Sequence, residues 1–180
     1  MTQYPANRLI FIDESGSNLS SSRLYARSFG GHRIRMPKPY VRGHHYSLIS
    51  AISLDGVQTS LYGTWATDAT IFETFIEKCL LPTLKAGDIV IMDNVKFHKT
   101  SRVQQCIQSV NATLKFLPPY SPDFSPIELM WSKIKSIIKQ YEPRTDQQFK
   151  KIIKIAFKAV TLSDLAGWFK HCGYMPSTVF

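Results

Sequence analysis

Cysteine is scarce in this chain, and its spacing suggests neither cross-links nor a metal site. Only Cys79, Cys106 and Cys172 occur among the 180 residues, an odd number without a Cys-x-x-Cys pair. A disulfide framework and a thiolate zinc site are therefore not expected. We expect each cysteine to pack as a small apolar side chain.

Long hydrophobic runs are also missing. No apolar stretch approaches the roughly 20 residues that a membrane-spanning helix requires. The polar residues 1–7 are too short and too hydrophilic for a secretory signal. These absences predict a cytoplasmic protein in a reducing setting, without a membrane partner.

Acidic residues are few compared with basic ones. The chain has 13 Asp and Glu against 22 Lys and Arg, which gives a formal net charge of +9 and a pI of about 9.5. Such an excess favours a polyanionic partner, with nucleic acid first and an anionic membrane surface second. The 44% hydrophobic content and the length are typical of one globular domain, which we expect to span residues 1–180.

Hydrophobic periodicity and turn residues predict alternating strands and helices. Asp55-Gly56 between apolar runs is a hairpin signal, Asp68 is suited to cap a helix, and Pro126 suits a first helical position with Ser125 as its cap. We expect strands at 8–14, 46–53, 57–64, 89–93 and 113–117, a loop at 15–22, and helices at about 68–84, 100–110, 126–141, 146–160 and after a Ser163 cap. This order predicts an α/β fold with a mixed central sheet and helices on both faces. It matches the ribonuclease H-like arrangement, in which the first and fourth strands lie side by side.

Three acidic residues stand at the ends of these expected elements. Asp13 and Asp93 each end an apolar strand, and Glu128 opens an amphipathic helix behind a proline-rich turn. Carboxylates that converge on one sheet edge repel each other unless a cation lies between them. Oxygen ligands suit Mg²⁺ or Mn²⁺, so the pattern predicts a metal-dependent enzyme of phosphodiester chemistry. Ordinary alternatives are a loop start at Asp13, a turn at Asp93 and a favourable helix-dipole position for Glu128.

Two further residues follow the second acid. Asn94 comes directly after Asp93, and His98 lies five residues beyond it. The imidazole of His98 could orient a phosphate, orient the acid, or hydrogen-bond a loop carbonyl.

Basic residues form two groups along the chain. Residues 133–158 hold eight Lys and Arg against two acids, an excess of six, and residues 23–44 hold a second basic cluster with glycines and prolines. A solvated helix face would explain the first group, but its continuity with the face that carries Glu128 favours DNA. The expected DNA-binding residues are Arg27, Arg33, Arg35, Lys135, Lys139, Lys150 and Lys154.

The acidic motifs together resemble a known family. They are Phe11-Ile12-Asp13-Glu14-Ser15, Met92-Asp93-Asn94 with His98, and Pro119-Tyr120-Ser121-Pro122-Asp123 through Pro126-Ile127-Glu128. Over residues 8–172 the chain resembles the DDE-superfamily transposases, and among them the bacterial insertion-sequence branch related to mariner elements. Ser125 stands where the family usually has Asn, and Val95 where a smaller residue is usual.

The resemblance implies a transposase catalytic domain that cleaves DNA strands and joins them by strand transfer. Asp13, Asp93 and Glu128 would hold Mg²⁺ or Mn²⁺, two ions per site when substrate is bound, supported by Asn94 and His98. Double-stranded DNA, as transposon ends and target, would be the partner, in a homodimer associated with the bacterial nucleoid. The family's N-terminal helix-turn-helix region is expected to be absent, so an upstream protein or reading frame would supply it. Another ribonuclease H-like nuclease, or an inactive DNA-binding module derived from a transposase, remains an alternative.

Overall fold

Five strands form one mixed sheet in the order β3-β2-β1-β4-β5. The computed structural model describes residues 4–19, 28–32, 35, 43–119 and 121–174. The strands are β1 (Leu9–Asn18), β2 (His45–Ser53), β3 (Gly56–Gly63), β4 (Ile89–Met92) and β5 (Thr113–Phe116). β1, β2 and β3 are antiparallel neighbours, whereas β4 runs parallel to both β1 and β5. The predicted adjacency of the first and fourth strands is confirmed.

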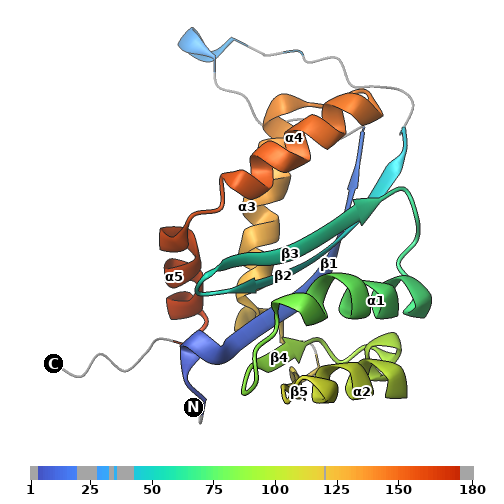
Figure 1. Ribbon diagram of the computed structural model, residues 1–180. Helices are drawn as coiled ribbons and strands as arrows, with labels where there is room; N and C mark the ends of the chain where they lie inside the picture. The colour runs from blue at the N-terminus through green and yellow to red at the C-terminus, as the bar shows by residue number, and fades with distance from the viewer. Residues whose placement is uncertain (1–3, 20–27, 33–34, 36–42, 120, 175–180) are drawn as a thin grey trace, which may run out of the picture.

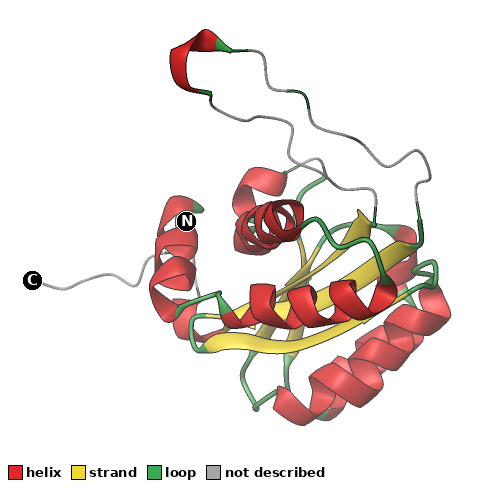
Figure 2. Ribbon diagram, turned by 90° about the horizontal axis from the view of Figure 1, so that it is seen from above, coloured by secondary structure: helices red, strands yellow, loops and turns green. Residues whose placement is uncertain are grey.

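Helices cover both faces of this sheet, as predicted (Figures 1 and 2). One face packs against α1 (Ala69–Phe75), a π-helical turn (Ile76–Leu80) and α2 (Ser101–Ser109). A 3-10 turn (Leu81–Thr83) follows the π-helical turn. The other face packs against α3 (Pro126–Tyr141), α4 (Asp146–Lys158) and α5 (Leu162–His171). In the described part of the chain, no helix is both long and apolar enough to cross a membrane.

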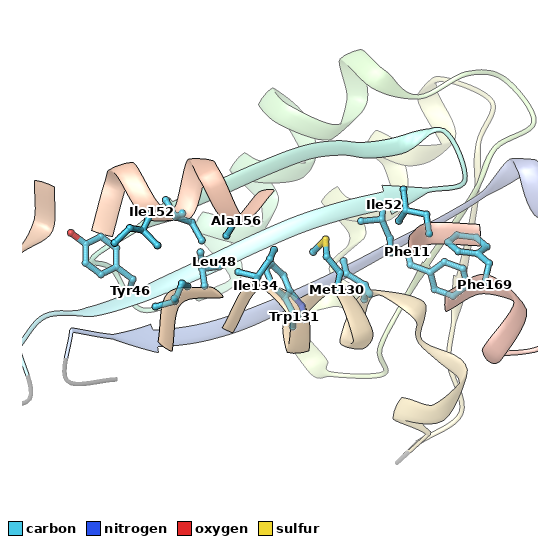
Figure 3. Packing of buried hydrophobic residues seen from close by; sticks show 14 of the residues in the cluster. Phe11, Tyr46, Leu48, Ile52, Met130, Trp131, Ile134, Ile152, Ala156 and Phe169 are labelled. Atoms are coloured by element: carbon cyan, nitrogen blue, oxygen red, sulfur yellow. The ribbon is translucent and has the colours of Figure 1, made fainter. Parts of the chain in front are cut away.

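The side chains of β1 alternate between these two layers. Leu9 and Phe11 belong to the core under α3 and α5, and Ile10 and Ile12 belong to the core under α1 and α2. Figure 3 shows the first of these cores, in which Trp131 projects from α3 toward the sheet. Because successive residues of a strand point to opposite faces, Asp13 continues the α3 side.

β1 is longer than expected, so the prediction of a loop from residue 15 was wrong for residues 15–18. These residues pair with β2, from Ser15 opposite Leu48 to Asn18 opposite His45. A Cβ atom on Gly16 would lie 2.7 Å from the His45 ring. Glycine at position 16 therefore permits the close approach of this ring. The Ser- and Gly-rich sequence does not itself favour a strand, but β2 pairs with residues 15–18 and so holds them in the sheet.

Most helix starts agree with prediction, and two differ. The side chain of Asp68 accepts from the backbone N–H of Ile71 at 2.9 Å, and Pro126 is the first residue of α3. Ser125 precedes α3 as expected, but its hydroxyl caps no backbone N–H among the described residues; its carbonyl accepts from Glu128 N at 3.1 Å instead. α5 begins behind Thr161 rather than the predicted Ser163 cap.

The apolar faces of α3 and α4 are buried over most of their length. Tyr141 is 55% exposed, since it is the last residue of α3. Phe157 of α4 is only half-buried. The buried residues of these two faces are Ile127, Met130, Trp131, Ile134, Ile138, Phe149, Ile152, Ile153 and Ala156.

Candidate active site

The parallel pairing of β1 and β4 places two acids level with each other. The register runs Leu9–Ile89, Ile10–Val90 and Phe11–Ile91. Continued by two residues, it sets Asp13 beside Asp93, one residue beyond the end of β4. Both acids are in phase with the strand residues that face α3.

α3 brings the third acid to the same place. Glu128 lies in the first turn of this helix, where Pro126 fixes the helix start. A pocket of about 410 Å³ opens there between the strand ends and the helix start. All three acids and Asn94 line this pocket. The complete set of lining residues is Ile12, Asp13, Asp93, Asn94, Val95, Leu117, Pro118, Pro119, Ser121, Pro122, Ser125 and Glu128.

The carboxylates share this pocket but are not gathered around one point. Among the described residues, no three His, Cys, Asp or Glu side chains are close enough together to hold a metal ion. Mutual repulsion keeps like charges apart, and two of the acids are engaged by neighbouring side chains. The donor set nevertheless fits a hard divalent cation, because it consists of carboxylates in a partly buried pocket.

Asp13 is held by a buried tryptophan. The indole Nε1–H of Trp131, which is 1% exposed, donates to Oδ2 of Asp13 at 3.0 Å. Burial, and then the negative charges of Glu128, Glu14 and Asp93, raise the pKa of Asp13 from its ordinary 3.8 to about 8. A nearby cation would remove this penalty, which supports a metal-binding role for the carboxylate.

Asp93 is held by a buried histidine. Nδ1 of His98 lies 2.6 Å from Oδ1 of Asp93, and Nε2 of the same ring lies 2.8 Å from Oε1 of Glu14. Oδ1 of Asp93 is shielded from solvent, and the ring does not meet it at hydrogen-bonding angles; among the described residues it has no well-aligned donor. Such a shielded oxygen is suited to accept a cation or a reoriented imidazole.

The pKa values at this bridge follow from its charges. Burial alone would lower the pKa of His98, but its contacts with Asp93 and Glu14 raise it to about 9, so the ring is a cation at neutral pH. Burial would raise the pKa of Asp93, but the His98 cation outweighs it and the pKa is lowered. Nδ1 of the ring also lies 3.4 Å from the backbone carbonyl oxygen of Asp93. Of the three alternatives for His98, the structure therefore supports contact with the acid and contact with a loop carbonyl, whereas the full burial of the ring leaves no access for a phosphate.

Sequence reasoning missed Glu14 and Trp131 as parts of the site. Glu14 follows Asp13 on the same strand and therefore points to the opposite face of the sheet. For this reason the sequence did not indicate that Glu14 contacts the site through His98. Trp131 was not predicted to belong to the site. Its position three residues after Glu128, one helical turn on, was the signal that could have connected it with the acids.

The predicted DNA-binding lysines lie in two separate clefts. Lys135 and Lys139 line a cleft of about 220 Å³ with His45 and the end of β1. Lys150 and Lys154 line another of about 630 Å³, between α4 and Ser60 of β3. The two clefts share no lining residue, and Lys133, the first basic residue of this group, is paired with Asp164 at 2.5 Å.

The predicted basic cluster of residues 23–44 is described only in part. Arg35 is described and exposed. Arg27 and Arg33 lie outside the described residues.

Sheet order, paired strand-end acids and a helix-borne glutamate define a ribonuclease H-like domain with an acidic site. Residues 8–150 match the family model described as DDE superfamily endonuclease. The chain therefore belongs to the DDE superfamily of endonucleases. None of the curated protein sequences matches it significantly.

Solved structures of a transposase share the fold. The Mos1 transposase paired-end complex with left transposon end superimposes with a TM-score of 0.74 at 17% identity, over 95% of this chain and 53% of that one. The Mos1 strand transfer complex gives 0.72 at 17% identity, over 95% and 52%. The catalytic domain of Mos1 mariner transposase gives 0.63 at 14% identity, over 94% and 78%. The chain thus spans about half the length of the Mos1 chains in the DNA complexes, and its fold is that of the catalytic domain.

Proposed function

We propose that this chain is a transposase catalytic domain, which cleaves DNA strands and joins them to a target with the help of divalent cations. The observation that carries the proposal is the shared pocket of Asp13, Asp93 and Glu128, reached from β1, β4 and α3. Membership of the DDE superfamily supports the reaction class. Mos1 structures with Mg and with Mn support the choice of ion.

Asp13, Asp93 and Glu128 hold the ions in this proposal, two of them when substrate is bound, and Asn94 borders the same pocket. Bound Mg²⁺ or Mn²⁺ supplies activation of the attacking oxygen and stabilisation of the leaving 3′ oxygen. Water is the nucleophile in strand cleavage, and the freed 3′-OH replaces it in strand transfer. No side chain is needed as a nucleophile.

Double-stranded DNA is the proposed partner. The Mos1 complexes contain transposon ends, and the net charge of +9 suits a polyanion. The proposed phosphate contacts of the described part are Lys135, Lys139, Lys150, Lys154 and Arg35. Arg27 and Arg33 are proposed to contribute as well. We further propose a homodimer on DNA at the bacterial nucleoid, with end recognition supplied by a helix-turn-helix segment outside these residues.

Cleavage of matched substrates tests this function. With Mg²⁺, the chain should nick duplex DNA, and Asp93→Asn should abolish nicking while the thermal melt stays cooperative. Faster cleavage of an RNA–DNA hybrid than of duplex DNA would favour a different ribonuclease H-like nuclease. Tight DNA binding without cleavage in Mg²⁺ or Mn²⁺ would favour a non-enzymatic module.

A further inference from the structure

A histidine without solvent contact joins two carboxylates from different strands. The side chain of His98 is 0% exposed, and its two ring nitrogens lie 2.6 Å from Asp93 Oδ1 and 2.8 Å from Glu14 Oε1. The ring is also fixed by aromatic neighbours. The Phe72 ring lies 4.1 Å from it at a tilt of 32°, and the Phe97 ring meets it edge-on at 4.5 Å.

Glu14 and the His98 ring lie on the side of the sheet that α1 covers, because the ring packs against Phe72 of α1 and Glu14 is in phase with Ile10 and Ile12 of β1. On β1 Glu14 pairs with Ile49 of β2, and it follows Asp13, so the two acids point to opposite faces. Glu14 is not among the described residues that line the pocket of the three acids. The Glu14 side chain is 18% exposed, and its carboxylate is paired with the His98 imidazole. Glu14 is therefore placed to influence Asp93 through this ring and not to contact a ligand directly.

We propose that Glu14 is a positioning residue, which acts through His98 to fix the Asp93 carboxylate toward the pocket and thereby sets the affinity for divalent cations. This inference rests on the proposed function, because it assumes that Asp93 holds an ion. Asp93 lies just beyond the end of β4, where the ladder no longer restrains it. A mobile carboxylate loses conformational entropy when it binds an ion, and this loss lowers the affinity for the ion. A buried partner that already holds the carboxylate in place reduces that loss.

Divalent-ion binding without DNA tests the inference independently of catalysis. Mn²⁺ would be titrated calorimetrically into the wild-type chain, Glu14→Ala, Glu14→Gln and a control, Asp55→Asn, which removes one exposed acid at the remote β2–β3 turn. Loss of an outer partner of a metal ligand typically costs roughly 10–100-fold in affinity. We expect that loss in Glu14→Ala, a smaller one in Glu14→Gln because the amide oxygen still accepts from Nε2, and none in Asp55→Asn.

A measurement on the wild-type chain guards against failure of a variant to fold. Saturation with Mg²⁺ should shift the ring nitrogen resonances of His98, because the ring touches a ligand of the ion. Unchanged His98 resonances in a chain that binds Mg²⁺, or equal Mn²⁺ affinities for the wild type and a folded Glu14→Ala, would overturn the role of Glu14 and leave the proposed function standing. A wild-type chain that binds no divalent ion, or binds as well as Asp93→Asn does, would overturn both.

Discussion

The carboxyl group of Asp13 gives the site a dependence on pH that can be measured without substrate. Its pKa is raised from 3.8 to about 8 by burial and by Glu128, Glu14 and Asp93. Between these values the folded chain holds a proton that the unfolded chain has lost. Stability from this group is therefore present at low pH and is lost as pH rises through about 8.

Asp13→Asn should remove this dependence. In metal-free buffer, the wild type should lose thermal stability between pH 5 and pH 8 more steeply than the variant does, because Asn carries no proton to release. Thermal unfolding with a chelator at several pH values provides the measurement. Parallel curves for the two proteins would show that Asp13 is ionised in the metal-free fold.

Trp131 provides a second test at the level of single residues. Phe at position 131 keeps an aromatic ring in the core but removes the Nε1–H that donates to Asp13 at 3.0 Å. Below about pH 8 the acceptor is a neutral carboxyl group, and a typical hydrogen bond contributes roughly 0.5–1.5 kcal/mol, so Trp131→Phe should lower the unfolding free energy by about that order and weaken Mn²⁺ binding. Trp168→Phe, a half-buried position on α5, is the control and should leave Mn²⁺ binding unchanged. Equal ion affinities in both variants would mean that the indole only fills space.

The start of α5 is a test at the level of elements. The Thr161 hydroxyl accepts from Asp164 N at 3.1 Å, and Asp164 Oδ2 accepts from Thr161 N at 2.8 Å and from Lys133 of α3 at 2.5 Å. The Lys133 bond and then the Thr161 bonds lower the pKa of Asp164 to about 2. This motif both caps α5 and ties it to α3.

Replacement of the cap should therefore destabilise the domain selectively. Thr161→Ala should cost about 1 kcal/mol, the usual loss for an N-cap, whereas Ser163→Ala at the exposed second position should cost little. Urea unfolding of both variants gives the comparison. A larger loss from Ser163→Ala would restore the cap expected from the sequence and contradict the observed one.

The two lysine clefts make separate predictions for DNA binding. Each phosphate contact contributes a slope of about −0.9 to log K against log salt on duplex DNA. Charge reversal to Glu of either pair, Lys135 with Lys139 or Lys150 with Lys154, should flatten this slope by up to about 2. The two effects should add, because the two clefts share no lining residue. An unchanged slope for one pair would identify that cleft as solvated surface.

At the scale of the whole molecule, the domain should hold DNA without reading it well. Sequence is read mainly by side chains that reach base edges, most often from a helix in the major groove, whereas phosphate contacts carry no sequence information. The basic residues proposed for DNA binding are assigned to phosphates. Competition binding at fixed salt should give similar affinities for transposon ends and random duplex, and a strong preference for an end by this chain alone would contradict that assignment.

The fold was predictable because its signals are local and consistent. The apolar runs before Asp13 and Asp93 define two strands. The order of elements matches the ribonuclease H-like arrangement, which sets these strands side by side, so the proximity of the two acids could be predicted. The Glu14–His98 contact did not follow, because it depends on how a short 3-10 turn (Lys96–Lys99) folds back under α1. Nor did the strand at residues 15–18, since its pairing is supplied by β2 rather than by its own composition.

The interdependence of the three acids is the most direct test of the account. If Asp13, Asp93 and Glu128 hold the same ions, then Asp13→Asn, Asp93→Asn and Glu128→Gln should each abolish Mg²⁺-dependent cleavage of duplex DNA, and the triple variant should be no worse than any single one, because residues that act as a unit are not additive. Glu142→Gln, away from the pocket, should cleave as the wild type does. Cleavage that persists in any one of the three folded variants, or in the wild type without a divalent ion, would contradict the central claim.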